Sequence, residues 1–326
     1  VETIGDYAFS GCTKLTSVAA NGVVFSNFRE FGINANNQSA NTFANCSALT
    51  SFPLSVNSPL TEIPKNTFYN CSALTSFVIP DAVTKIGENA FQNDTGLSSV
   101  QFGTGLSTIS KYAFRGCSAL TEVELDGAIS SIDEYAFGNC TGLGKVSVSA
   151  ANDLTIIQNA FGGCSAVSSV SIGSKGGNVA INGNLMSGGT ITAASFYGNS
   201  VSFTAHLFGL TNTPDSKWHT LNLTGANTIT CSNSSGNNQG FIWYLGAENN
   251  ASNGIIYVSD DTAKASLATA LIGNSRKYAC AVTDGGTFTD NVSFTQGTLY
   301  SGNALVNPGY IFDGWYTKDV DGNYSD

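Results

Sequence analysis

The strongest constraint on this chain is a repeated apolar string, Ile-Gly-x-x-Ala-Phe-x-x-Cys-x-x-Leu-x-x-Val, which first runs from Ile4 to Val18. Its phenylalanine recurs along the first half of the chain, at Phe9, Phe43, Phe68, Phe91, Phe114, Phe137 and Phe161. Successive positions are 34, 25, 23, 23, 23 and 24 residues apart. A period of this length predicts a repeat architecture in which each copy is one structural unit. The long first step indicates an insertion near residues 21–39.

One coil of about 23 residues cannot bury its own apolar face, so neighbouring coils must stack and share a core. In the segment Leu120-Thr-Glu-Val123-Glu-Leu125, apolar and polar residues alternate as in a strand with one buried face. Stacking pairs the equivalent strands of successive coils into a parallel sheet. The apolar residues then face the core, and the residues between them face outward.

Composition and charge exclude several classes of partner. Only 11% of the residues are charged, against about 25% in an ordinary globular protein. The net charge is −10, and the 13 Lys and Arg residues form no basic cluster. Since nucleic acids and anionic membranes are bound through clustered cations, neither is predicted as a partner. No apolar run approaches the roughly 20 residues that span a bilayer, so no membrane insertion is predicted within this sequence.

The repeat resembles the BspA-type leucine-rich repeats of bacterial surface proteins, specifically over residues 1–172 and loosely over residues 173–282. The resemblance implies a leucine-rich-repeat solenoid of the α/β class, strand-dominated, right-handed and curved, with a parallel β-sheet on its concave face. It also implies an exported bacterial protein, extracellular or at the cell surface, engaged in adhesion or host interaction. Val1 opens within a repeat, so we expect a fragment whose targeting signal lies elsewhere.

The second half predicts a less regular continuation of the same domain, which we place at residues 1–282. Regular coils occupy residues 1–172, and irregular coils with long polar loops occupy residues 173–258. Residues 255–273 predict a capping strand followed by a short helix, which begins at an Asp pair and ends at a Gly. Solenoids need such a terminal cap to cover the last coil.

The tail, residues 283–326, predicts a separate small β-rich module. Its segment Asn307-Pro-Gly-Tyr-Ile-Phe-Asp-Gly-Trp-Tyr-Thr317 resembles the Listeria–Bacteroides repeat, which is strung along bacterial surface proteins. We expect this copy to be partial. As an independent motif, it favours the same surface location.

Six of the eight cysteines share one repeat position, three residues after the phenylalanine: Cys12, Cys46, Cys71, Cys117, Cys140 and Cys164. A coil spacing of roughly 5 Å would permit disulfides between neighbours. However, Asp94 occupies the slot between Cys71 and Cys117, and no pairing scheme serves all six. We therefore expect small buried hydrophobic residues. The sequence assigns no partner to Cys231 or Cys280.

Metal and catalytic patterns are weak. His206 and His219 are 13 residues apart and match no ligand spacing. Residues 319–323 alternate oxygen ligands as calcium loops do, but the following Glu is missing, which favours a polar hairpin. No nucleophile, base and carboxylate set stands out. The sequence therefore predicts no metal, no cofactor and no enzymatic activity.

The exposed strand positions predict a ligand-binding ribbon of small polar residues with an acidic centre. Besides Val78, the predicted contact residues are Ser76, Ser99, Gln101, Glu122, Glu124, Lys145, Ser147, Ser169 and Ser171. Such a ribbon suits recognition of an extracellular protein or glycan through many modest contacts.

Two alternatives remain open at this point. One is a structural stalk that holds other domains away from the cell. The other is an enzyme or accessory module acting on polysaccharide, since Glu122, Glu124 and Asp126 alternate along one strand and face the same side. The aromatic residues Trp218, Trp243 and Tyr244 could also place a contact site in the irregular half, although core packing is the favoured role for them.

Overall fold

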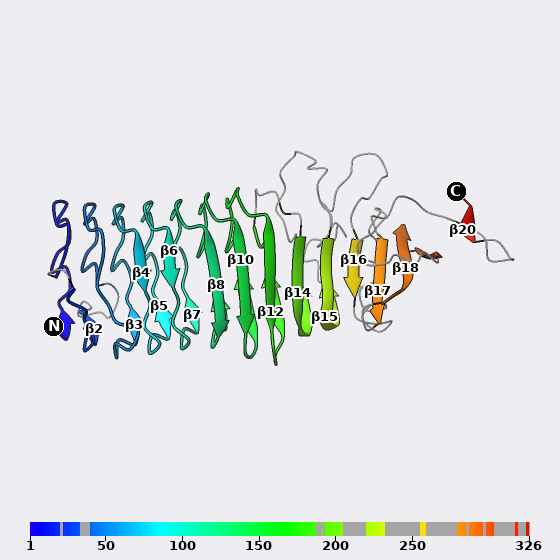
Figure 1. The fold of residues 1–326 in the computed structure, drawn as a ribbon, viewed down its shortest axis with the longest axis horizontal. Helices are drawn as coiled ribbons and strands as arrows, with labels where there is room; N and C mark the ends of the chain where they lie inside the picture. Colours follow the sequence, from blue (N-terminus) through cyan, green and yellow to red (C-terminus); the bar gives the residue numbers. More distant parts are fainter. Residues whose placement is uncertain are drawn as a thin grey trace.

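The chain winds into a stack of coils that follow one long axis (Figure 1). The computed structural model describes residues 1–19, 22–32, 40–186, 191, 193–204, 220–231, 255–258, 279–284, 287–295, 298–302, 317–318 and 324–325. From residue 279 onward only the backbone of the strands is described. The described residues contain no helix, which agrees with the predicted strand-dominated solenoid. The capping helix predicted within residues 255–273 lies outside the described part.

The predicted parallel sheet is present, and we call it the main sheet. Its strands are β4 (Ser76–Val78), β6 (Ser99–Gln101), β8 (Glu122–Gly127), β10 (Lys145–Ala150), β12 (Ser169–Ser174) and the first half of β14 (Ala193–Phe203). β4 pairs with β6, and β8, β10, β12 and β14 pair in that order. The register joins equivalent repeat positions, for example Val123 to Val146 and Val146 to Val170. Alternate residues are buried, because each strand places one side on the core.

A second parallel ladder runs through the isoleucine positions of the repeat, which the sequence analysis did not predict. Its strands are β3 (Glu62–Ile63), β5 (Lys85–Ile86), β7 (Thr108–Ile109), β9 (Ser131–Ile132), β11 (Leu154–Ile157), β13 (Val179–Asn182) and the end of β14. Near the N-terminus, β1 (Thr3–Ile4) pairs in the same way with β2 (Glu30–Phe31). Phe31 therefore takes the isoleucine place of its coil, and the insertion is divided between the segments before and after it.

The core is organised around a column of stacked phenylalanine rings, one from each regular coil. From Phe9 to Phe161, successive ring centroids are 5.1, 5.5, 5.3, 4.9, 5.2 and 5.3 Å apart, and no pair is tilted by more than 11°. All of these rings except Phe9 are fully buried. The ring spacing follows the coil spacing, so the repeat period fixes the geometry of the column.

The cysteine position lies beside this column, as predicted. Cys46, Cys71, Cys117, Cys140 and Cys164 are buried and free, whereas Cys12 is free but exposed. Each buried thiol donates a hydrogen bond to the backbone carbonyl oxygen of the column phenylalanine in the preceding coil, at 3.0–3.2 Å. The cysteines therefore act as small core residues that also satisfy a backbone acceptor. The side chains of Cys231 and Cys280 lie outside the described part.

The turns around the phenylalanine contain two left-handed residues in each regular coil. The first, two residues before the phenylalanine, is Tyr7, Asn41, Asn66, Asn89, Tyr112, Tyr135 or Asn159. The second, two residues after it, is Gly11, Asn45, Asn70, Asn93, Gly116, Asn139 or Gly163. Gly and Asn adopt positive φ at low cost, whereas Tyr does so rarely. The positive φ required at these two positions therefore explains why the turns are rich in asparagine.

Beyond the regular coils the parallel sheet continues through β15 (Thr220–Cys231), β16 (Ile255–Val258) and β17 (Ala279–Asp284). Strands β13, β14, β15 and β16 lie within residues 173–258, for which irregular coils are predicted. β18 (Thr287–Thr295) pairs antiparallel with β17 and with β19 (Thr298–Gly302), and β20 (Thr317–Lys318) pairs with β21 (Tyr324–Ser325). The domain boundary at residue 282 and the Listeria–Bacteroides-type module remain predictions.

Candidate functional site

The predicted contact residues lie in two parallel rows on the outer side of the main sheet, which we call the sheet face. The first row is Ser76, Ser99, Glu122, Lys145 and Ser169, and the second is Val78, Gln101, Glu124, Ser147 and Ser171. Val78, Ser147 and Ser171 are half-buried and the others are exposed. The strand register therefore brings the nine predicted residues onto one face, in a block on β4 and β6 and a block on β8, β10 and β12.

The acidic centre of the sheet face is largely neutralised by lysines. Glu124 forms an ion pair with Lys145 of the next strand, and Asp126 Oδ1 lies 2.9 Å from Nζ of Lys175. The hydrogen bond from Lys175 lowers the pKa of Asp126, and the hydrogen bond to Glu124 raises the pKa of Lys145. The carboxyl group of Asp126 therefore does not resemble a general acid, whose pKa must be raised. Within the described chain Glu122 forms no ion pair.

The same residues offer no metal site. Across the described ranges, no group of three or more His, Cys, Asp or Glu side chains is placed to hold a metal ion. His206, His219, Trp218, Trp243, Tyr244 and residues 319–323 lie outside these ranges. Searched over the same residues, the structure has no helix that is both long and apolar enough to cross a membrane.

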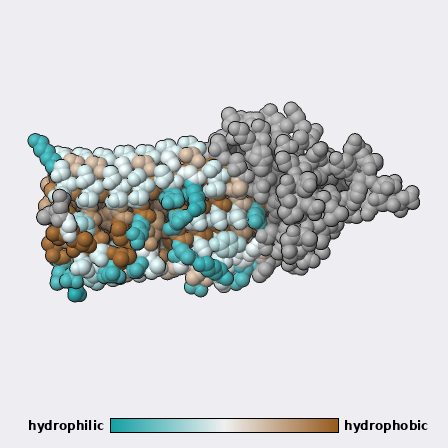
Figure 2. Space-filling model, viewed as in Figure 1, coloured by the Kyte–Doolittle hydropathy of each residue, from teal (hydrophilic) through white to brown (hydrophobic). Residues whose placement is uncertain are grey.

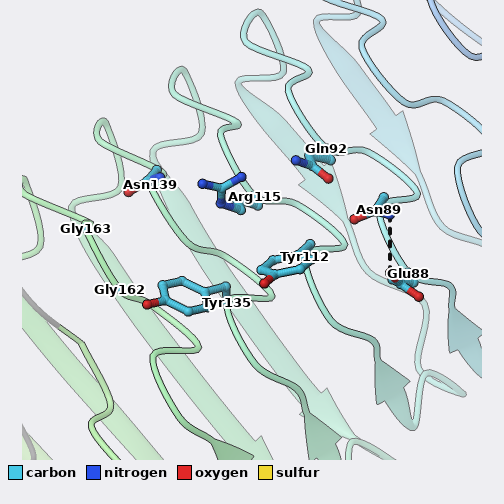
Figure 3. A pocket seen from close by; sticks show the side chains of 9 residues that line it. All are labelled: Glu88, Asn89, Gln92, Tyr112, Arg115, Tyr135, Asn139, Gly162 and Gly163. Carbon is cyan, nitrogen blue, oxygen red and sulfur yellow. Dashed lines mark hydrogen bonds between the residues drawn. The ribbon is translucent and has the colours of Figure 1, made fainter.

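A second candidate lies on a different surface, over the turns that carry the left-handed residues. We call this the turn face and define it as residues 88–93, 111–116, 134–139 and 158–163. It contains a shallow hollow of about 680 Å³, lined by side chains of three consecutive coils and by two glycines of the next (Figure 3). In Figure 3, Tyr112 and Tyr135 lie in one row along the coils, and Gln92, Arg115 and Asn139 form a neighbouring row.

The two tyrosine rings at this hollow are held in place by their surroundings. Their centroids are 5.9 Å apart and their planes are tilted by 32°. The Tyr135 hydroxyl accepts a hydrogen bond of 3.0 Å from the side-chain amide of Asn159. Lys111 Nζ and Arg115 Cζ lie 4.8 and 5.6 Å from the Tyr112 ring centroid, within the range of cation–π contacts.

Sequence reasoning missed this hollow, although one signal was present. The repeat position two residues before the phenylalanine is Asn in four coils and Tyr in three, and two of those three, the coils of Phe114 and Phe137, are adjacent. Equivalent positions of neighbouring coils lie side by side, so two consecutive tyrosines make an aromatic pair. The pair can be recognised only when the alignment of the turns in neighbouring coils is known, and the sequence alone did not give that alignment.

Residues 1–60 and 61–184 match, in six copies, the family described as BspA type leucine rich repeat region. The chain belongs to this family. Both candidate surfaces of this BspA-type solenoid lie mostly or wholly within residues 61–184, where the matched copies supply consecutive coils.

Solved structures similar to this BspA-type chain come from several bacteria. A leucine-rich cell surface protein from Faecalibacterium prausnitzii A2-165 is 17% identical, with a TM-score of 0.41 over 77% of this chain and 81% of that one. A leucine-rich repeat protein from Bacteroides ovatus ATCC 8483 is 17% identical, with a TM-score of 0.33 over 86% and 87%. The pneumococcal vaccine antigen PcpA is 16% identical, with a TM-score of 0.36 over 71% and 62%. No curated protein matches the chain.

Proposed function

We propose that this chain is a secreted or cell-surface binding protein that uses its sheet face to recognise an extracellular protein or glycan of a host or neighbouring cell. The observation that carries this proposal is the alignment of mainly polar side chains, half of them serines, in two rows across five strands. Five strands about 4.8 Å apart make a ribbon roughly 19 Å long, which is the scale of a small protein or oligosaccharide contact.

The sheet face has the physical properties of a preorganised binding surface. Its strands are backed by the phenylalanine column, so the exposed side chains project from a rigid layer. Serine side chains lose little conformational entropy on binding, which lowers the cost of ordering them at an interface. Because Glu124 and Asp126 are paired with lysines, a partner does not meet a strongly charged field. Figure 2 shows a described surface of mostly intermediate hydropathy, with separate groups of strongly hydrophilic side chains and a hydrophobic patch near the N-terminal end.

The proposal is of a binding protein without catalytic activity. The one carboxylate cluster that suggested chemistry on polysaccharide has two of its three members in ion pairs, and the pKa of Asp126 is lowered rather than raised. A glycosidase requires one carboxyl group that stays protonated near neutral pH. This arrangement supports recognition over hydrolysis.

A solid-phase binding screen tests the proposal, using the folded chain against extracellular-matrix proteins, mucins and an array of glycans. The Ser147→Arg variant places a long side chain at the centre of the sheet face. The matched control, Ala128→Arg, adds the same side chain at an exposed position after β8. We expect saturable binding that Ser147→Arg weakens at least tenfold and Ala128→Arg leaves unchanged. Absence of binding across the whole panel would overturn the proposal and favour a structural stalk.

The acidic centre is tested with a further variant, Glu122→Gln/Glu124→Gln. If the partner is bound mainly through the serines of the two rows, this variant changes the affinity by less than threefold. A loss comparable to that of Ser147→Arg would place the contact on the carboxylates instead. Release of sugar from any glycan of the panel would contradict the non-catalytic assignment.

A further inference from the structure

The turn-face hollow carries features of a ligand site that stacking of the coils does not require. The backbone at the position two before the phenylalanine needs a positive φ, and Asn meets that need at Asn66, Asn89 and Asn159. Tyr112 and Tyr135 adopt the same conformation, with φ of 60° and 52°, although a tyrosine there is less favourable. Tyr7 is a third tyrosine at this position, but only Tyr112 and Tyr135 stand in adjacent coils, where two aromatic rings lie in place of Asn.

Glycines under Tyr135 make room for its ring to lie against the coils. A Cβ atom on Gly138 would lie 2.8 Å from Tyr135 Cδ1, and one on Gly162 would lie 3.1 Å from Tyr135 Cε1. Both glycines are buried, while the tyrosine remains half-exposed. With its hydroxyl held by Asn159, the ring is fixed before any ligand arrives. A fixed ring with an exposed surface is a stacking platform at low entropic cost.

Arg115 adds a positive charge that no carboxylate pairs with among the described residues. Six other Lys and Arg side chains in the described part of the chain form ion pairs, including Lys111 with Glu134 at 2.7 Å. The Arg115 guanidinium forms none there, and its contact is with the Tyr112 ring. A planar guanidinium fixed beside a ring is suited to paired hydrogen bonds with a carboxylate.

The rest of the hollow favours a sugar over a protein side chain. Gln92 and Asn139 bring amide donors and acceptors beside the arginine, and the lining contains no aliphatic residue (Figure 3). Protein hot spots are well-packed, desolvated pockets, whereas this surface is open and mostly polar. A pyranose ring has one face of C–H groups, which can stack on tyrosine, and hydroxyl groups, which can bond amides.

We propose that the turn-face hollow binds a carboxylated glycan. Sugar rings stack on Tyr112 and Tyr135, the carboxylate binds Arg115, and the hydroxyl groups bond Gln92 and Asn139. This site is separate from the sheet face, so it does not depend on the function proposed above. A chain with both sites can hold two partners at once, or one long partner at two places.

The test is titration calorimetry of the intact chain with four acidic oligosaccharides: a galacturonate tetramer, a hyaluronan tetrasaccharide, an alginate tetramer and sialyllactose. Each is compared with its carboxyl-reduced form. We expect saturable binding of at least one acidic probe, weakened at least tenfold by carboxyl reduction. The Arg115→Gln variant should produce the same loss for the acidic probe and almost none for the reduced one.

Tyr112→Asn and Tyr135→Asn are the matched aromatic variants, because Asn already occupies this position in other coils and is compatible with the fold. Each should weaken binding of both the acidic and the reduced probe. Ser147→Arg on the sheet face should leave the titration unchanged, which separates this site from the one proposed above. No binding of any probe by the folded chain, or binding that survives Arg115→Gln and Tyr135→Asn, would overturn the proposal. The proposal would also be overturned if Tyr135→Asn abolished binding to a protein while the binding of every glycan probe stayed unchanged.

Discussion

At the scale of single residues, Asp94 is the place where the repeat departs from its own rule. It occupies the cysteine position and is fully buried. Oδ1 accepts a hydrogen bond of 2.6 Å from the backbone N–H of Cys71, but Oδ2 has no partner among the described residues. Burial raises the pKa of Asp94 well above its ordinary value of 3.8. The folded protein therefore binds a proton here that the unfolded chain releases.

The sign of this linkage gives a prediction. Above pH 3.8 the unfolded chain ionises Asp94 while the folded chain keeps it protonated, so stability falls as pH rises toward the folded pKa. Asp94→Cys restores the thiol of neighbouring coils and should raise the free energy of unfolding at pH 7 by about 1–3 kcal/mol. The gain should shrink near pH 4. Urea unfolding at both pH values measures it, and an equal gain at both would contradict the assigned protonation.

The repeat cysteines make a second prediction at this scale. Burial raises the pKa of Cys46 to about 11, and it raises that of Cys117 as well. Since thiolates react and thiols do not, a thiol reagent at pH 8 should label Cys12 rapidly and the five buried repeat cysteines only after unfolding. Peptide mass spectrometry with and without urea checks this. Rapid native labelling of Cys117 would show that the core opens between coils.

At the scale of elements, the phenylalanine column should contribute most at its middle. Phe114 stacks on Phe91 at 4.9 Å and on Phe137 at 5.2 Å, and it is fully buried. Phe114→Ala should lower the free energy of unfolding by about 3–5 kcal/mol, and Phe114→Leu by less. Phe9→Ala should cost less than Phe114→Ala, because Phe9 stacks on one ring only and is partly exposed. Equal costs at the two positions would mean that coils do not share one column.

Elements also show what could be predicted from the sequence. The main sheet was predictable because Leu-x-x-Val-x-Ψ alternates over enough residues to define a strand with one buried face. The isoleucine ladder was not, because strands such as Thr108–Ile109 are two residues long and carry no periodicity. Their pairing is set by the coils stacked on either side. The sheet-face residues follow from alternation alone and were placed correctly, whereas their role as ligand contacts is still a proposal.

The turn-face hollow could not be predicted in the same way, because it depends on contacts between coils rather than on a pattern within one. Tyr135 lies on Gly162 of the next coil, and its hydroxyl is bonded by Asn159 of that coil. Arg115 is notable only because no carboxylate among the described residues pairs with it, whereas Lys111 pairs with Glu134. Each of these facts requires the turn register. Sequence periodicity gives the coil length and the strand faces but not the side-chain directions of the turns.

At the scale of the whole molecule, the solenoid behaves as a one-dimensional array. Each coil bonds mainly to its neighbours, through the two parallel ladders, the phenylalanine column and backbone hydrogen bonds between turns, such as that of Phe91 N to Ala113 O at 2.7 Å. Ion pairs such as Lys65 with Glu88 also join neighbouring coils, although exposed pairs contribute about 1 kcal/mol or less. Stability is then a sum of coil and interface contributions.

This organisation predicts that a whole coil can be removed without loss of the fold. Deleting residues 110–132 removes one 23-residue period and joins Ile109 to Asp133, which stands where Ser110 stood. Phe91 would then stack on Phe137, and β6 would lie beside β10. We expect a folded protein whose circular dichroism spectrum keeps the β-strand shape of the intact chain. Its melting temperature should be lower, and its stack should be shorter by about 5 Å.

The matched control deletes twelve residues, 121–132, and joins Leu120 to the same Asp133. It removes fewer residues but breaks the period, so strand positions of one coil face turn positions of the next. Apolar residues such as Val146 lose their equivalent partner, and buried backbone groups lose their hydrogen bonds, which costs more than a missing coil. The shorter deletion should therefore be the more damaging one. If both deletions were tolerated equally, register between coils would not be what holds this molecule together.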